Sequence, residues 1–399
     1  MTDGLERLGL RFNPFEPAAS GVPLGEELWI PDRWREPVER LLDTSESGRG
    51  VKALAIQGEY GSGKTYLLHW LETVELPRRR IRPFFLDNPG VQFYDLANSL
   101  LRQIGRYEFA KMLWEFLSPQ LPGFQMSMFD EGLIAWLRSV KKHKQQEEAL
   151  RVMARAALDK GITTNKEIAY RLGQIVMGTV DRPYFQYRDF VAGRKGAVVA
   201  EKEEAPYFTA IIRILKQAGH TAGIAFLIDE FEEIALQKRL SRRQAYDYLA
   251  TIKRLINVAR NEDFWLIVSM TPKAAEITRQ LDAGLWERFT SQGAYEFKIS
   301  LLSKEEAREL IQRRLQNARP GEAEEVPESL SPFPENLAEI LRPTTVSLPR
   351  RLVKVAFYAI SEAQQPPEVA IPFSAEFLRQ IEERAYPAPA AEEGEKGAS

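Results

Sequence analysis

The sequence has 399 residues, 44% of them hydrophobic, so it can bury the cores of two or three packed units. Its formal net charge is only -2, so contact with nucleic acid would need a local basic patch. The absence of cysteine excludes disulfides and thiol chemistry, and three scattered histidines argue against a zinc site. We expect a cytoplasmic protein, because we find neither a signal-peptide pattern nor a run of membrane-spanning length.

The first fifty residues are an irregular, proline-containing lead-in, within which residues 34–42 have the apolar spacing of a short amphipathic helix. An apolar run at 51–56 has strand length and leads into a glycine-rich turn, after which residues 65–74 have helical spacing. Residues 81–86 are a second predicted strand. Pro83 predicts a marginal position for it, because proline cannot donate a hydrogen bond within a sheet.

Residues 93–205 have mostly helical periodicity and are too many for a simple crossover between two strands, so we predict an inserted helical subdomain. Residues 154–173 have the rhythm of a helix-turn-helix. Thr163 or Thr164 would cap its second helix, with Glu167 near the capping-box position. The alternative is a capped helix pair that binds no DNA.

Two further strands are predicted at 223–228 and 264–269, and both are apolar enough to be covered on both faces. Helices are predicted at 207–218 and 242–258. This alternation of strands and helices predicts an α/β fold with three layers around a parallel sheet.

The strand signal stops near residue 302, and helical spacing at 304–315, 335–341, 349–363 and 375–385 predicts an all-α domain. The expected organisation is a lead-in, a core that contains the helical insertion, a helical domain and a disordered tail. Their bounds are 1–50 for the lead-in, 51–300 for the core, about 93–205 for the insertion, 301–386 for the helical domain and 387–399 for the tail.

The glycine-rich turn matches the phosphate-binding loop pattern in full and lies between a predicted strand and a predicted helix. Such a loop points successive backbone N–H groups at phosphate oxygens, and the following helix adds its positive N-terminal end. Lys64 would reach the β- and γ-phosphates, and the Thr65 hydroxyl would bind Mg²⁺. We therefore expect ATP and Mg²⁺ to be bound, with these nucleotide-binding residues: Gly58, Glu59, Tyr60, Gly61, Ser62, Gly63, Lys64, Thr65 and Tyr66.

A pair of carboxylates, Asp229 and Glu230, ends the third predicted strand. Beside a phosphate loop, Asp229 can orient Mg²⁺ through its water ligands, and Glu230 can polarise an attacking water. The alternative is that the pair only caps the next helix. The loop and the acids together favour a catalytic pair and predict an ATPase.

These residues resemble the AAA+ superfamily of ATPases, which combines a phosphate loop, an Asp-Glu strand end, a polar end on a later strand and a helical lid. The resemblance implies that residues 301–386 are the lid. It also implies that Ser269 or Thr271 senses the γ-phosphate, at a position where the family usually has asparagine.

Two arginine segments extend the resemblance. Residues 285–289 resemble the segment that carries an arginine finger, which implies that Arg288 reaches a neighbouring subunit's nucleotide in a homo-oligomer. Residues 347–352 resemble the lid arginine segment without the family's glycine, which implies a nucleotide contact from Arg350, or from Arg351 beside it. The alternative for each arginine is an exposed helix charge.

Within the superfamily, the lead-in and residues 33–41 resemble the initiator-type branch, which includes origin-recognition and transposition ATPases. This implies that the lead-in packs around the adenine. Residues 207–213, 218–220, 227–232, 269–272 and 189–193 are also similar to P-loop ATPases of BREX-type phage-defence systems. That similarity implies a role in genome defence alongside other proteins.

Basic residues follow the acid pair closely and predict a stripe that can track a phosphate backbone in an assembled ring. The alternative is a solvated helix face. The aromatic residues at 184–190 either stack on bases or pack in the core. The predicted basic stripe comprises Lys238, Arg239, Arg242, Arg243, Lys253, Arg254 and Arg260.

Two functions from different classes fit these patterns. The first is an ATPase motor or clamp that assembles on double-stranded DNA as a ring or filament, in genome defence or mobilisation. The second is an ATP-controlled protein-interaction or signalling switch with slow hydrolysis and no DNA binding, which the balanced net charge favours. A small-molecule kinase fits poorly, because it leaves the lid and arginine segments unexplained.

Overall fold

A computed structural model describes most of the chain, and its elements fall into two compact units. We call them the sheet unit, Glu36–Gln57 and Trp70–Lys298, and the helical unit, Met1–Arg35, Gly58–His69 and Ile299–Ser399. The described residues are 3–15, 29–46, 53–86, 93–121, 143–181, 206–231, 241–259, 262–290, 295–320, 329–365 and 369–387.

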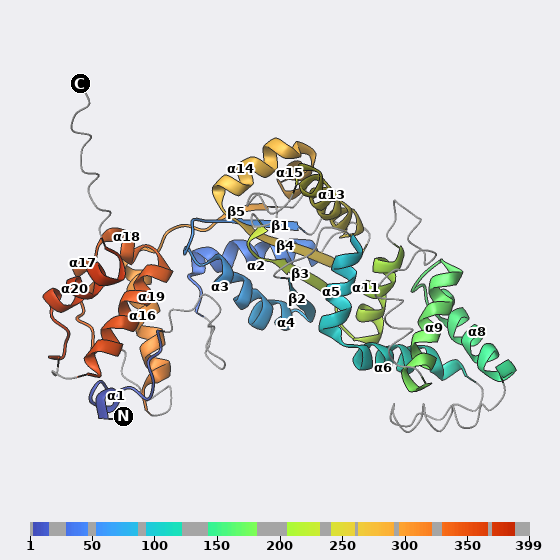
Figure 1. Cartoon of the computed structure of the whole chain (residues 1–399), viewed down its shortest axis with the longest axis horizontal. Coiled ribbons are helices and arrows are strands. Elements are labelled where there is room, and N and C mark those ends of the chain that lie inside the picture. Colours follow the sequence, from blue (N-terminus) through green and yellow to red (C-terminus); the bar gives the residue numbers. More distant parts are fainter. Residues whose placement is uncertain are drawn as a thin grey trace. The chain divides into compact units, whose positions relative to one another are not determined.

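Five parallel strands form one sheet in the order β2-β3-β4-β1-β5 (Figure 1). Strand β4 therefore lies between β1 and β3. Because all five strands are parallel, their carboxyl ends meet at one edge of the sheet. The strands are β1 (Ala53–Gln57), β2 (Ile81–Leu86), β3 (Gly223–Ile228), β4 (Phe264–Met270) and β5 (Tyr295–Lys298).

The four predicted strands are confirmed, and β2 is the edge strand that Pro83 predicted. Every residue of β1, β3 and β4 is buried, as expected for parallel strands covered on both faces. Strand β5 was not predicted. Its four residues alternate aromatic and charged side chains, and so short a run gives little signal without the neighbouring β1.

Helices surround the strands, so the sheet unit is an α/β structure with a parallel sheet (Figure 1). Helices α13, α14 and α15 group together beside β5, β1 and β4. The helices are α4 (Leu76–Arg78), α5 (Phe93–Ile104), α6 (Arg106–Leu117), α8 (His143–Asp159), α9 (Lys166–Asp181), α11 (Pro206–Ala218), α13 (Arg242–Ala259), α14 (Pro272–Leu281) and α15 (Ala283–Thr290), with a π-helical turn at Leu71–Glu75 and a 3₁₀ turn at Ser118–Gln120.

The chain passes from one unit to the other within two helices, α2 (Asp32–Glu46) and α3 (Lys64–Trp70). Helix α2 is longer than the predicted helix at 34–42. Helix α3 begins at Lys64, one residue before the predicted helix, and gives way to the π-helical turn after Trp70.

Four phenylalanine rings form the centre of the packing between the sheet and α11. Phe226 of β3 packs edge-to-face against Phe84 of β2, Phe208 of α11 and Phe264 of β4, with centroid distances of 6.2, 5.6 and 5.0 Å. All four side chains are buried. The same hydrophobic core continues into α6, α8 and α9, so the helices between β2 and β3 share their core with the sheet.

The predicted helix-turn-helix segment lies in two consecutive helices, α8 and α9, that pack on each other, but the predicted cap is wrong. Asn165, not Thr163 or Thr164, caps α9: its Oδ1 accepts hydrogen bonds from the N–H groups of Glu167 and Ile168 at 2.9 and 3.2 Å. Thr163 instead accepts a bond from the Asn165 N–H at 3.1 Å. The cap must directly precede the first helical residue, Lys166, which only Asn165 does.

In the helical unit, residues near the N-terminus pack on the C-terminal helices. Arg7 donates to the carbonyl oxygens of Ala363 and Val369 at 2.7 and 3.0 Å, and Asn13 donates to that of Phe357 at 3.1 Å. The four predicted helices are confirmed, two of them with identical bounds. The helices are α1 (Asp3–Arg7), α16 (Lys304–Ala318), α17 (Leu337–Ile340), α18 (Pro343–Val346), α19 (Pro349–Ala363) and α20 (Ala375–Ala385).

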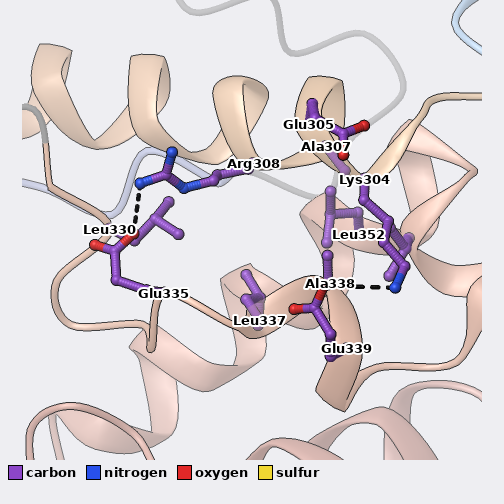
Figure 2. Close-up of a pocket in the computed structure, with 11 residues that line it drawn as sticks. Lys304, Glu305, Ala307, Arg308, Leu330, Glu335, Leu337, Ala338, Glu339 and Leu352 are labelled. Atoms are coloured by element: carbon purple, nitrogen blue, oxygen red, sulfur yellow. Dashed lines mark hydrogen bonds and ion pairs between the residues drawn. The ribbon is translucent and has the colours of Figure 1, made fainter.

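A pocket of about 100 Å³ lies among these C-terminal helices (Figure 2). Its apolar lining includes Leu330, Leu337 and Leu352, and two ion pairs stand at its sides, Arg308–Glu335 at 2.5 Å and Lys304–Glu339 at 3.4 Å. None of the predicted site residues lines this pocket. In the chain as described, no helix is long and apolar enough to cross a membrane.

We expect Phe226→Ala to destabilise the sheet unit by about 3–5 kcal/mol, because it empties the centre of the four-ring cluster. Tyr246→Ala, on an exposed aromatic side chain of α13, should change stability by no more than about 0.5 kcal/mol. Urea unfolding followed by circular dichroism measures both. Equal, small effects would contradict the packing described for Phe226.

Candidate phosphate loop and acidic strand end

Two glycines of the loop after β1 have left-handed backbone conformations. Gly61 and Gly63 have φ values of +79° and +103°, which side chains other than glycine rarely adopt. The Ser62 N–H donates to the Glu59 carbonyl oxygen at 3.1 Å and closes a turn. Position 58 needs glycine for another reason, because a Cβ there would collide with the Ser62 hydroxyl.

Lys64 is folded back over this loop. Its ammonium donates to the carbonyl oxygens of Gly58 and Glu59 at 2.9 and 3.2 Å, and the residue is only 8% exposed. Thr65 and Tyr66 follow it in the first turn of α3 and are half-buried. The loop thus brings the positive charge of Lys64 and the N-terminus of α3 together. A charged oxygen of an anion accepts a stronger hydrogen bond from the Lys64 ammonium than a carbonyl oxygen does.

Two buried polar atoms at this part of the chain lack a hydrogen-bond partner in the described structure, the Ser62 hydroxyl and the Gln57 side-chain nitrogen. An unsatisfied buried group costs about 1–3 kcal/mol, so both are suited to a polar ligand. Ser62 belongs to the predicted loop, whereas Gln57 was not predicted as a site residue. Its signal was a polar residue that ends an apolar strand directly before the loop.

Trp34 packs against the loop and was also missed as a site residue. A Cβ at Gly63 would lie 2.9 Å from the Trp34 ring, which is 2% exposed. The indole N–H donates to the Ser300 carbonyl oxygen at 3.2 Å, which holds the ring in place. The helical period marked Trp34 only as an apolar position, because contacts between distant segments leave no local pattern.

Arg350 and Arg351 point to different neighbours. The Arg350 guanidinium lies 4.6 Å from the ring centre of Tyr60, at the exposed tip of the loop, and the Arg350 N–H donates to the Gly61 carbonyl oxygen at 3.3 Å. Arg351 lies 5.0 Å from the ring of Tyr386, which directly follows α20. The structure therefore brings Arg350, and not Arg351, against the phosphate-type loop.

At the end of β3, the two acids differ in environment. Asp229 is 8% exposed and accepts a hydrogen bond from the buried Ser269 hydroxyl of β4, while Glu230 is exposed. Glu230 has φ +47°, a left-handed conformation that costs an L residue about 1–2 kcal/mol. Non-glycine residues in this region cluster at functional sites, where the surrounding structure maintains the strain.

Ser269 and Thr271 are separated by the structure as well. Thr271 is the N-cap of α14, and its hydroxyl accepts a hydrogen bond from the Ala274 N–H at 3.3 Å. The Ser269 hydroxyl is instead directed at Asp229. Ser269 therefore contacts an acid at the end of the neighbouring strand.

Arg288 lies in the last turn of α15. It is half-buried and donates to the side-chain oxygen of Asn257 on α13. This contact holds the guanidinium at the surface of the sheet unit.

The predicted basic stripe is described only in part. Arg243 and Arg254 are exposed on α13, eleven residues apart and therefore on nearly the same helix face. Lys253 pairs with Asp282 at 3.3 Å. Lys238, Arg239, Arg260 and the Arg242 side chain lie outside the described structure, as do the aromatic segment at 184–190 and the similarity segment at 189–193.

No protein-family model matches this sequence, and no curated protein matches it. The site is therefore interpreted from its own residues.

We expect Gly63→Ala to destabilise the helical unit by about 1–3 kcal/mol, since it adds backbone strain and a clash with Trp34. Gly9→Ala is a matched control, because Gly9 has φ +69° but nothing near its would-be Cβ. Urea unfolding of both variants should show the larger loss at Gly63. Equal losses would mean that Trp34 does not constrain the loop.

Proposed function

We propose that this chain is an ATPase of the AAA+ type that binds and hydrolyses ATP with Mg²⁺. The observation that carries the proposal is that a phosphate-type loop directly follows β1 and an acid pair directly follows β3 of one parallel sheet. Between them in the sheet lies β4, which carries Ser269. Parallel strands gather their carboxyl ends at one edge, the usual place for a site in such folds.

The residues of the loop and the acid pair suit a nucleoside triphosphate with its metal ion. The backbone N–H groups of the loop and the N-terminus of α3 would bind the phosphates, and Lys64 would exchange its carbonyl acceptors for phosphate oxygens. Thr65 and Asp229 would hold the metal ion, which supplies charge neutralisation when it is bound. Asp229 is kept in one orientation for this role by the Ser269 hydroxyl.

Glu230 is the proposed general base. It is exposed, next to the metal carboxylate in sequence, and its left-handed backbone turns it away from the path of an ordinary strand. The carboxylate would accept a proton from the attacking water as the water bonds to the γ-phosphorus and the bond to the bridging β-phosphate oxygen breaks, so that ADP and phosphate leave. Arg350, already packed on the loop through Tyr60, would donate to developing negative charge there.

We further propose that the chain assembles as a homo-oligomer, a ring or filament, and acts on double-stranded DNA in genome defence or mobilisation. Arg288 would serve as the finger that a subunit offers to its neighbour. Support comes from the resemblance to initiator-type and BREX-type ATPases and from the exposed Arg243 and Arg254 on one face of α13.

The alternative is an ATP-controlled protein-interaction switch with slow hydrolysis and no DNA binding. One contact favours it: Lys253, in the middle of the proposed DNA-binding stripe, already has its charge paired with Asp282. A stripe with fewer available charges releases fewer counterions and binds a phosphate backbone less strongly.

We expect Lys64→Ala to abolish ATP binding, and Glu230→Gln to bind ATP but hydrolyse it about 10²–10⁴ times more slowly. Glu276→Gln, on an exposed glutamate of α14, is the matched control and should hydrolyse ATP at the normal rate. Isothermal calorimetry measures binding, and phosphate release measures turnover. Normal turnover in Glu230→Gln would show that another group is the base.

We expect duplex DNA to raise ATP hydrolysis, and nucleotide to raise the oligomer size seen by analytical ultracentrifugation. Arg288→Ala should keep ATP binding but slow hydrolysis about 10³-fold or more, because finger arginines stabilise transition-state charge. Arg155→Ala, an exposed arginine of α8, is the control. If duplex DNA neither raises hydrolysis nor is retained at low salt, the switch alternative stands and the DNA proposal fails.

A further inference from the structure

The helical unit carries a cluster of aromatic and basic side chains around the first half of α19. Each cation lies over a tyrosine ring: Arg350 over Tyr60 at 4.6 Å, Arg351 over Tyr386 at 5.0 Å, and Lys354 over Tyr386 at 4.7 Å. Lys354 also lies 5.8 Å from a further ring, that of Tyr358. We call this set the tyrosine–cation patch: Tyr60, Arg350, Arg351, Lys354, Tyr358 and Tyr386.

The patch has an excess of positive charge. Within the described ranges, none of its three cations forms an ion pair, and Lys354 donates to a backbone carbonyl oxygen, that of Ala385, at 3.3 Å. Burial raises the pKa of the Tyr386 hydroxyl, while Arg351 and Arg350 act in the opposite direction. The tyrosine therefore stays neutral near pH 7 and leaves the positive charges uncompensated.

The outer rings of the patch are accessible. Tyr60 is 68% exposed and Tyr358 is 41% exposed. An exposed large aromatic side chain leaves apolar surface in contact with water, and a ligand could cover that surface. Arg350, Lys354 and Tyr358 are spaced four residues apart on α19, so they lie along one face of the helix. Along this face two cations, Arg350 and Lys354, precede the exposed ring of Tyr358.

We propose that the tyrosine–cation patch is a binding site for single-stranded nucleic acid. It lies outside the predicted basic stripe and takes a different ligand from the duplex of the proposed function, and it requires no ATP hydrolysis. The three cations would bind successive phosphates, while Tyr60 and Tyr358 offer ring faces to unpaired bases. Stacked base pairs in a duplex hide those base faces, so the patch favours single strands.

A test on the full-length protein measures the fluorescence anisotropy of labelled oligo(dT) of twenty nucleotides at several salt concentrations. We expect Lys354→Ala to lower the slope of log affinity against log salt by about 0.7, as the loss of one phosphate contact predicts for single strands. Tyr358→Ala should weaken binding about tenfold, or about 1.4 kcal/mol. Tyr358→Phe should bind like the wild type.

The matched control is the pair Tyr107→Ala and Lys111→Ala on α6, an exposed tyrosine and a lysine with the same four-residue spacing. Neither control should alter binding. Urea unfolding confirms that each variant is folded, and Tyr358→Phe separates loss of the ring from loss of the hydroxyl. If the patch variants bind oligo(dT) like the wild type, the proposal is overturned.

Tyr60 and Arg350 belong both to this patch and to the proposed nucleotide site. Two further arms, which alter neither residue, distinguish binding at the patch from the proposed ATPase. Lys64→Ala should lose ATP binding and retain oligo(dT), since Lys64 is not part of the patch. A duplex of the same length that binds as tightly as oligo(dT), with equal losses in the patch variants, would overturn the assignment to single strands. ATP hydrolysis without any oligo(dT) binding would reject the patch and leave the ATPase standing.

Discussion

The hydrogen bond between Ser269 and Asp229 depends on the constraint that shapes the sheet unit, the parallel alignment of its strands. Because β3 and β4 run in the same direction with Ile228 opposite Val268, the next residue of each strand meets at the same edge. Both side chains are buried there, and each supplies the other's polar partner at the end of two fully buried strands, β3 and β4. The loop continues the chain from the same end of β1.

The loop itself depends on contacts from distant parts of the helical unit. Glycines at 61 and 63 permit its backbone conformation, but Trp34 and Arg350 occupy the space that other residues at those positions would need. The Lys64 ammonium then donates its hydrogen bonds to two carbonyl oxygens of the loop itself. In the proposed function, phosphate oxygens would compete for that ammonium, so nucleotide binding would require Lys64 to leave these carbonyl acceptors.

The candidate residues of each pair have different neighbours in the structure. Ser269 faces an acid whereas Thr271 caps a helix, and Arg350 packs on the loop whereas Arg351 packs on Tyr386. Arg288 donates a hydrogen bond to Asn257, and its role as an arginine finger stays a prediction about the assembled oligomer. The tyrosine–cation patch around α19 is a second surface, and its cations and exposed rings suit the phosphates and bases of a single strand. The patch includes none of the acids at the sheet edge.

The sequence by itself determined the four longer strands, the loop, the edge position of β2 and most helices, because hydrophobic period and glycine spacing are local signals. Only the tertiary structure decided that β5 pairs with β1, that Asn165 caps α9, that Ser269 contacts Asp229, and that Arg350 packs on Tyr60 of the loop. Likewise, Trp34 and Gln57 gained their roles from packing and burial. Such contacts join residues far apart in the chain, so no local pattern encodes them.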